Sequence, residues 1–313
     1  MIGRREFLKR SAATSAGVVA CGLASRLGAQ PTQPSGSQQQ MLTRKIPSTA
    51  EPVPAFGMGT WQTFDVDPAD EKALAPLAEV LQIFFDGGGR VIDSSPMYGR
   101  AEQVTGVLSE RLKINDRLFL ATKVWTGGEE QGVAQMNRSL ERVKRDKLEL
   151  MQVHNLTDWQ TQLKTMRAWK EQRRFKYIGI THWQPDRFDD MEQIMQREKV
   201  DFVQLPYSIA VRGAEKRLLP AAADTGTAVL VMRPFEGGNL FSKTRDKPLP
   251  EFAQGFASSW AQAFLKFILA HAAITCVIPA TSKPQHMRDN LQSGYGRLPT
   301  EDERKRLIAA LGV

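Results

Sequence analysis

Short apolar runs and longer helical patterns alternate along this chain, and this alternation restricts its fold more than any other feature. The apolar runs predict eight strands, at residues 56–61, 90–93, 118–123, 148–154, 176–181, 201–205, 228–232 and 275–279. Apolar residues spaced three and four apart predict helices between them, at 71–86, 101–112, 131–144, 158–173, 185–198, 213–223 and 257–271. Strands that alternate with helices form parallel sheets, and eight such units predict an α/β protein with a (β/α)8 TIM barrel.

A doubly wound open sheet is the competing architecture for such an alternation. It would be favoured by a glycine fingerprint that opens a helix directly after the first strand. Residues 57–62 read GMGTWQ and lack the third glycine of that fingerprint. The barrel is therefore the predicted domain of residues 41–313, and it begins with a hairpin-like stretch rich in prolines and turn formers.

Polar side chains stand at the ends of three consecutive apolar runs. The second run ends at Asp93, the third at Lys123 and the fourth at His154, while Tyr98 follows Asp93 within a Pro/Gly turn. In a parallel barrel the carboxyl ends of all strands open on one face, and residues there are typically catalytic. We therefore expect these four side chains to converge at the barrel mouth.

The four residue types suit the transfer of a proton to an oxygen atom. An ion pair between Asp93 and Lys123 would keep the lysine charged near Tyr98, whose ordinary pKa of about 10 makes it a weak acid at neutral pH. The ammonium would lower the pKa of the phenol toward the working range of a general acid. His154 could donate a hydrogen bond that orients a substrate carbonyl, while another group delivers hydride to carbon.

Motifs of several other enzyme classes are absent from the sequence. It contains no Walker loop, no paired-histidine helix motif and no Gly-x-Ser-x-Gly elbow. The histidines at 154, 182, 271 and 286 do not have the spacing of metal ligands, so we expect no metal site. A barrel hydrolase or isomerase would need paired carboxylates or a metal set, and neither is found.

The first thirty residues have the pattern of an export signal. Arg4 and Arg5 precede Glu-Phe-Leu-Lys, and a weakly apolar segment follows at 11–23. This resembles a twin-arginine signal peptide over 1–30, read by the twin-arginine export machinery, and the segment is too short for a stable membrane span. We expect a periplasmic or cell-envelope protein. Leu27-Gly28-Ala29 is a candidate cleavage site; if Cys21 in VVACG is lipidated instead, the protein is lipid-anchored. A basic tail on a cytoplasmic protein is the alternative.

Charge and the remaining thiol restrict the partners further. Residues 31–40 (PTQPSGSQQQ) predict a polar linker with nothing to bury. The net charge is +8, but residues 1–30 hold five basic residues and one acidic residue, so only +4 belongs to the rest. With no long basic run after residue 30, we expect no nucleic-acid partner. Cys276 is the one cysteine after Cys21, which predicts a buried small side chain and no internal disulfide in the domain.

Taken together, the motifs at the predicted strand ends resemble those of the aldo-keto reductases, over about residues 42–310. The matching segments are GMGTW at 57–61, IDSSPMYG at 92–99, TKVW at 122–125, VHN at 153–155, VQLPYS at 203–208, RPFEGG at 233–238 and VIPATSKPQHMRDN at 277–290. In that family the nicotinamide lies across the barrel mouth and a tyrosine is the proton donor. The resemblance implies that role for Tyr98, assisted by Lys123 and Asp93, with His154 setting substrate orientation.

The resemblance also implies a set of binding residues. It implies cofactor contacts for Thr60, Asp93, Thr181, His182, Gln204, Arg233, Thr281, Ser282, Lys283, Asp289 and Asn290. It places Trp61 and Trp125 in a substrate pocket beside His154. NADP(H) is favoured over NAD(H), with Lys283 and Arg288 as partners for the 2′-phosphate.

Two functions follow from this resemblance and remain open at the level of sequence. The first is an exported NAD(P)-dependent oxidoreductase that reduces small aldehydes or ketones to alcohols, with a carbonyl or alcohol as its small-molecule partner. The second is an exported nicotinamide-binding sensor or interaction subunit on the same fold, with little turnover.

Overall fold

The computed structural model describes residues 40–313. The predicted signal peptide and Cys21 therefore lie outside the described residues, as does all of the linker except its last residue. In the described part, eight parallel strands are hydrogen-bonded in the order β10-β9-β8-β7-β6-β5-β4-β3. They are β3 (Met58–Gly59), β4 (Val91–Asp93), β5 (Phe119–Val124), β6 (Leu148–His154), β7 (Phe175–Thr181), β8 (Phe202–Pro206), β9 (Ala228–Met232) and β10 (Cys276–Val277). All eight predicted strands are confirmed.

The sheet closes between its first and last strands. Single bridges join Phe56 to Val277 and Gly59 to Ala280, so β3 meets β10. Gly57 N donates to the Val277 carbonyl at 2.9 Å, and a Cβ at position 57 would lie only 2.9 Å from the Val91 carbonyl oxygen. The glycine therefore permits the close approach that turns the sheet into the predicted (β/α)8 barrel.

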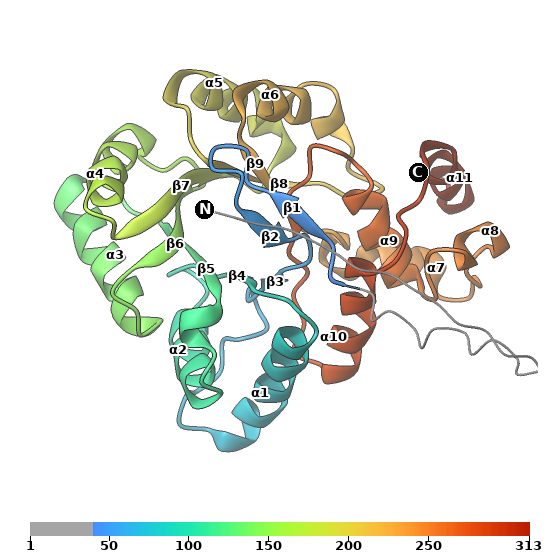
Figure 1. Ribbon diagram of the computed structural model, residues 1–313, viewed down its shortest axis with the longest axis horizontal. Helices are drawn as coiled ribbons and strands as arrows, with labels where there is room; N and C mark the ends of the chain where they lie inside the picture. Colours follow the sequence, from blue (N-terminus) through green and yellow to red (C-terminus); the bar gives the residue numbers. More distant parts are fainter. Residues whose placement is uncertain (1–39) are drawn as a thin grey trace, which may run out of the picture. The chain divides into compact units, whose positions relative to one another are not determined.

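Helices surround the strands (Figure 1), and seven of them match the predicted segments. These are α1 (Glu71–Asp86), α2 (Ala101–Arg111), α3 (Glu129–Arg142), α4 (Trp159–Glu171), α5 (Phe188–Glu198), α6 (Leu218–Thr225) and α9 (Trp260–Leu269). Short 3-10 turns lie at Asn115–Arg117, Pro185–Arg187, Gly213–Glu215, Glu236–Gly238 and Gln292–Gly294. No helix within residues 40–313 is long and apolar enough to cross a membrane.

Four further helices were not predicted. They are α7 (Asn239–Thr244), α8 (Glu251–Gln254), α10 (Pro284–Leu291) and α11 (Glu301–Leu311). The first three have at most eight residues, too few for a clear apolar period. In α11 a capping box between Thr300 and Glu303 starts the helix, and α10 supplies one wall of the site described below.

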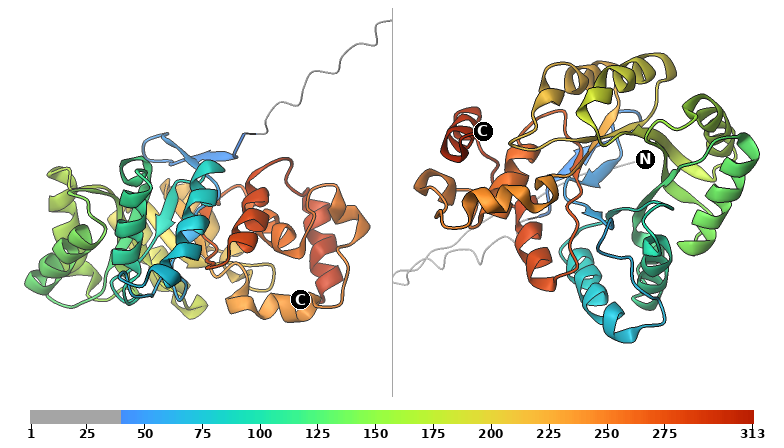
Figure 2. Two further views of the ribbon diagram at one scale, coloured as in Figure 1. Left: turned by 90° about the horizontal axis from the view of Figure 1, so that it is seen from below. Right: turned by 180° about the vertical axis from the view of Figure 1, so that it is seen from behind.

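A β-hairpin lies across the end of the barrel where the strands begin (Figures 1 and 2). Its strands β1 (Thr43–Lys45) and β2 (Pro52–Pro54) are antiparallel, which confirms the predicted hairpin. Tyr177, near the start of β7, donates a hydrogen bond to Glu51 at 2.5 Å and lies 2.8 Å from the Thr49 hydroxyl. The hairpin thus covers this end and leaves the opposite, carboxyl end for the site.

The barrel interior beneath the hairpin is a separate apolar cluster. It joins two hairpin side chains to inward-facing residues of the strands: Ile46, Val53, Val91, Phe119, Ala121, Leu150, Tyr177, Phe202, Ala228, Leu230, Cys276 and Ile278. Cys276 is buried with a free thiol, as predicted, and burial raises the pKa of that thiol. This packed layer makes the barrel a rigid support rather than a pore.

Candidate active site

Asp93 and Lys123 form a buried ion pair at the carboxyl ends of β4 and β5. Lys123 Nζ lies 2.6 Å from Asp93 Oδ2, and both side chains are almost fully enclosed. The ammonium also donates to the Ser94 carbonyl at 2.6 Å, and Gln152 Nε2 donates to Asp93 Oδ1 at 3.1 Å. Burial alone would lower the pKa of Lys123, but Asp93 and Tyr98 together outweigh this effect, and the pKa lies above its usual value. The lysine is therefore a permanent cation.

Tyr98 lies beside this pair, as the sequence predicted. Lys123 Nζ is 4.8 Å from the centroid of the Tyr98 ring, and the tyrosine lines a cavity at the barrel mouth. The expected direction of its pKa is wrong, however: burial raises the pKa of Tyr98 by more than the Lys123 charge lowers it, and Asp93 raises it further. The physical reason is that burial removes the water that would stabilise the phenolate, and this effect exceeds the stabilisation by the ammonium.

His154 completes the group at the end of β6. Its ring lies edge-on to the Tyr98 ring, with centroids 5.9 Å apart and planes at 88°, and its Nδ1 is 2.9 Å from Ser95 Oγ. Burial, with smaller effects from the charges of Lys123 and His182, lowers the pKa of His154 to about 2. The imidazole is therefore neutral at physiological pH, and it can offer one donor and one acceptor.

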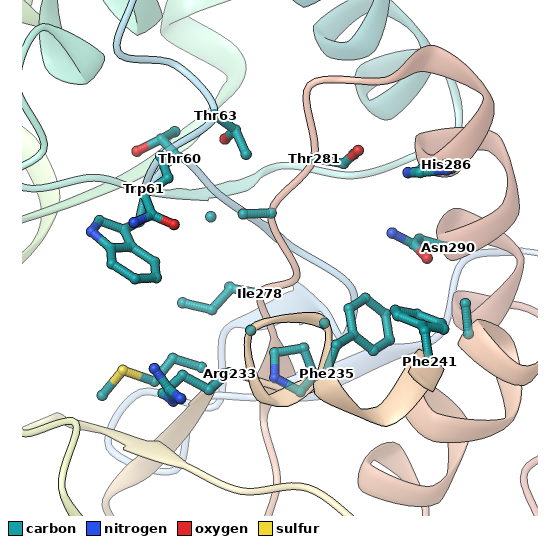
Figure 3. Close-up of a pocket in the computed structure, with 18 of the residues that line it drawn as sticks. Thr60, Trp61, Thr63, Arg233, Phe235, Phe241, Ile278, Thr281, His286 and Asn290 are labelled. Atoms are coloured by element: carbon teal, nitrogen blue, oxygen red, sulfur yellow. The ribbon is translucent and has the colours of Figure 1, made fainter. Parts of the chain in front are cut away.

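A cavity of about 1190 Å³ extends from these residues to α10. Asp93, Tyr98 and His154 line one end, and His286 and Asn290 line the other. Figure 3 shows the intervening wall, where Phe235 and Phe241 lie below the opening between the Trp61 side and α10. Pockets for drug-sized ligands measure about 300–1,000 Å³, so this space suits a longer ligand together with a small one.

Comparison with known proteins agrees with this geometry. Residues 55–306 match the model of the family described as the aldo/keto reductase family. The chain belongs to that family.

Its similarity to individual aldo/keto reductases is low but extends over most of each chain. It is 24% identical to the glyoxal reductase of Bacillus subtilis, covering 80% of this chain and 86% of the relative. It is also 24% identical to the methylglyoxal reductase YeaE of Escherichia coli, covering 76% and 84%. A Klebsiella pneumoniae aldo/keto reductase solved with NADP and acetate superposes with a TM-score of 0.68 at 22% identity, covering 84% of this chain and 93% of that one.

Most of the predicted site residues of this aldo/keto reductase line the cavity. They are Thr60, Trp61, Asp93, Tyr98, His154, Arg233, Thr281, Asp289 and Asn290. Lys123 lies behind this wall, where it acts on Tyr98 rather than on a ligand. Trp125 lies outside the wall as well, with its ring centroid 6.1 Å from that of His154, so it flanks the substrate end.

Five residues predicted to contact the cofactor are not part of the cavity wall: Thr181, His182, Gln204, Ser282 and Lys283. Lys283 is exposed to solvent, and Arg288 points instead to α1, where it pairs with Glu79 at 2.8 Å. Two other basic residues, Arg245 and His286, line the cavity, and His286 belongs to α10. A residue's position in a helix decides which way it points, and α10 was not predicted as a helix.

Two buried amide groups test whether a nicotinamide would fit. Gln204 accepts a hydrogen bond from Thr181 at 3.0 Å through Oε1, but its Nε2 has no partner among the described residues. Asn155, which lines the cavity, has an Oδ1 that is likewise unpartnered within residues 40–313. Of the two residues, Asn155 lines the cavity, and its Oδ1 can accept a hydrogen bond from the NH2 group of a carboxamide. The residues present therefore fit a nicotinamide cofactor.

Sequence reasoning missed several residues of the site. Ser95 and Gln152 contact His154 and Asp93, and Trp183 lines the cavity with nearly half of its surface exposed. The signal for Gln152 was its place two residues before His154, because alternate residues of a strand face the same side. Trp183 lies two residues after a predicted strand end, whereas nothing in the sequence pairs Ser95 with His154.

Proposed function

We propose that this protein is an NAD(P)H-dependent reductase that converts small aldehydes or ketones to alcohols, with Tyr98 as the proton donor. One observation carries the proposal: Tyr98 lines the cavity and its hydroxyl donates to no acceptor within residues 40–313, although a buried ammonium lies beside its ring. Its proton is thus available to a ligand. The similarity to proteins named glyoxal and methylglyoxal reductase supports a small carbonyl substrate.

The bound nicotinamide would supply the hydride that reduces the carbonyl carbon. Asn155, which lines the cavity, would hold its carboxamide through the unpartnered Oδ1. Tyr98 donates its proton to the carbonyl oxygen as negative charge develops there, which is general acid catalysis. Because burial raises the pKa of Tyr98, the phenol remains protonated and ready to donate at neutral pH.

Lys123 then stabilises the tyrosine after the proton has left. Two of the three ammonium protons are occupied, by Asp93 and by the Ser94 carbonyl. The third can be directed to the phenolate oxygen, and an opposite charge at this distance is strongly favourable inside a protein. Neutral His154 supplies a second donor at the same substrate oxygen, while Trp61 and Trp125 provide apolar surface for the substrate.

We also propose that NADP(H) is favoured over NAD(H). Arg245 and His286 line the cavity, and a guanidinium is the side chain best suited to a phosphate. Titration of protein fluorescence with NADPH and NADH should give a lower Kd for NADPH. Equal affinities, or a lower Kd for NADH, would contradict this preference.

The test of the reductase function is the Tyr98→Phe variant. Absorbance of the reduced nicotinamide should fall when the wild-type protein meets NADPH and methylglyoxal. Tyr98→Phe should lower kcat by about 10²–10⁴-fold, because a positioned general acid contributes that much. NADPH binding should be retained in the variant. A wild-type protein that binds NADPH but does not oxidise it with any small carbonyl would instead indicate the sensor.

We further propose that residues 1–30 direct export to the periplasm or cell envelope through the twin-arginine machinery. The support is the sequence pattern alone, since this segment lies outside the described residues. Replacing Arg4 and Arg5 with lysine should leave the full chain in the cytoplasm. An unchanged distribution after cell fractionation would refute the proposal, and lipid labelling lost in Cys21→Ser would identify a lipid-anchored form.

A further inference from the structure

We propose that Ser95 is a positioning residue that fixes His154 in the tautomer carrying its proton on Nε2. This inference rests on the proposed reductase function and deepens it, because it determines which ring nitrogen faces the substrate. Ser95 makes no contact with the substrate in this assignment and acts only through His154.

The contact between Ser95 and His154 joins two buried side chains. Ser95 Oγ lies 2.9 Å from His154 Nδ1, across 59 residues of sequence, and Ser95 itself is fully enclosed. The turn after β4 orients the hydroxyl, because the backbone N–H of Met97 donates to Ser95 Oγ at 3.3 Å. Both ends of the contact are therefore fixed by the fold.

The direction of this hydrogen bond follows from counting donors and acceptors. A hydroxyl has one proton to donate, and the Met97 N–H already occupies an acceptor site of Ser95 Oγ. His154 Nδ1 is the only acceptor within residues 40–313 that lies within reach of the Ser95 proton. If Nδ1 carried the proton instead, the Ser95 hydroxyl would be left buried without an acceptor. Leaving a buried donor unpaired is costly, so Ser95 donates and Nδ1 accepts.

This direction determines what His154 presents to the cavity. A neutral imidazole that accepts at Nδ1 carries its proton on Nε2. Nε2 has no hydrogen bond to the described residues, and His154 lines the cavity, so this N–H is free for a ligand. It can donate to the carbonyl oxygen that Tyr98 protonates. The other tautomer would turn a lone pair toward that oxygen and repel it.

The direct test is the protonation state of the ring in the full chain. Long-range proton–nitrogen NMR correlation of ¹⁵N-labelled protein near pH 7 distinguishes a protonated from an unprotonated ring nitrogen. His154→Asn assigns the signals among the four histidines. We expect an unprotonated Nδ1 and a protonated Nε2 in the wild-type protein without any added ligand. A protonated Nδ1 in the wild type overturns the inference whatever the variants do.

The Ser95→Ala variant tests the role of the hydroxyl. We expect a mixture of tautomers at His154, and a loss of about tenfold in kcat/KM for methylglyoxal with an unchanged Kd for NADPH, because one buried hydrogen bond is removed. Ser109→Ala is the matched control: it also loses a buried hydroxyl, which bonds to Gly106 in α2 away from the cavity, and should keep the single tautomer. A single Nε2-protonated tautomer in Ser95→Ala refutes the role of Ser95.

The two measurements also separate this inference from the proposed function. The NMR experiment contains no substrate, so its outcome does not depend on turnover. If the expected tautomer is found but no carbonyl compound is reduced, the reductase proposal fails and the assignment of the tautomer stands. If turnover is found with Nδ1 protonated, the reductase proposal stands and the role of Ser95 fails.

Discussion

The two ends of this barrel each hold a tyrosine beside a lysine and a carboxylate, yet the two hydroxyls differ in their hydrogen bonds. At the hairpin end, the Tyr177 hydroxyl donates to Glu51, which also pairs with Lys176 at 2.6 Å. At the mouth, Asp93 is bound to Lys123 and Gln152, so the proton of Tyr98 has no acceptor within residues 40–313.

The pKa of both phenols is raised, so acidity alone does not separate them. Burial and the hydrogen bond to Glu51 raise the pKa of Tyr177 to about 12, and burial raises that of Tyr98. The difference lies in where the carboxylate points. A carboxylate that accepts the phenol proton locks the tyrosine into a structural role. One that is bound by a lysine and an amide leaves the proton free for chemistry.

The largest difference between the two ends should appear in the free energy of unfolding when each lysine is replaced. Lys123→Met leaves Asp93 buried without its counter-ion, and breaking a buried pair in this way costs about 3–5 kcal/mol. Lys176 is half exposed, so Lys176→Met should cost no more than about 1 kcal/mol. Urea unfolding of both variants measures the free energies, and equal losses would remove the contrast between the two ends. Turnover should fall only in Lys123→Met.

As the pH falls, the free energy of unfolding should first decrease through His154 at the mouth, and only at lower pH through Glu51 at the hairpin end. The pKa of His154 is about 2 in the folded protein and about 6.5 when unfolded, so the unfolded state binds the extra proton and stability falls as pH drops below 6.5. Between pH 6.5 and 5 this loss amounts to about 2 kcal/mol. His154→Asn should reduce the pH dependence by that amount in unfolding experiments across this range.

At the hairpin end the carboxylate of Glu51 is protonated only at lower pH. Burial raises the pKa of Glu51, but its hydrogen bonds with Lys176 and Tyr177 lower it more, and the net pKa lies below the ordinary 4.5. Its stabilisation is therefore complete above pH 4.5 and is lost only below it. An unchanged slope in His154→Asn between pH 6.5 and 5 would show that the histidine is not the group responsible.

Removing the hydroxyl of Tyr177 should affect stability without affecting catalysis. Tyr177→Phe loses the bonds to Glu51 and Thr49, and we expect the free energy of unfolding to fall by about 1–2 kcal/mol. Its kcat with NADPH and methylglyoxal should match the wild type. A large loss of kcat would mean that a change at the hairpin end alters the site at the mouth. The packed apolar cluster between the two ends argues against such an effect.

The smallest effect is expected in the pH dependence of the reduction rate. Since the pKa of Tyr98 is raised above 10 and that of His154 is about 2, neither group titrates between about pH 6 and 9. The profile of kcat/KM against pH should be flat in this range and fall at higher pH as Tyr98 loses its proton. A basic limb well below pH 9 would mean that Lys123 acidifies the phenol after all.

Much of this site could be predicted because it follows the strand pattern. Asp93, Lys123 and His154 end three successive strands, and parallel strands of one barrel present their ends on one face. The part of the cavity at α10 was predicted less well: Lys283 and Arg288 were expected to contact the cofactor there, but neither lines the cavity, whereas His286 does. Those directions depend on short helices that periodicity does not reveal.

By itself, the sequence determined the eight strands, their parallel arrangement and the meeting of four candidate catalytic residues at one mouth, because periodicity and the alternation of strands with helices can be seen along the chain. Only the tertiary structure decided the direction of the pKa shift of Tyr98, the partner of the His154 ring and the partner of each carboxylate. These depend on burial and on contacts such as Ser95 with His154, which join residues far apart in the chain. Desolvation is a property of the packed interior, and no stretch of sequence carries it alone.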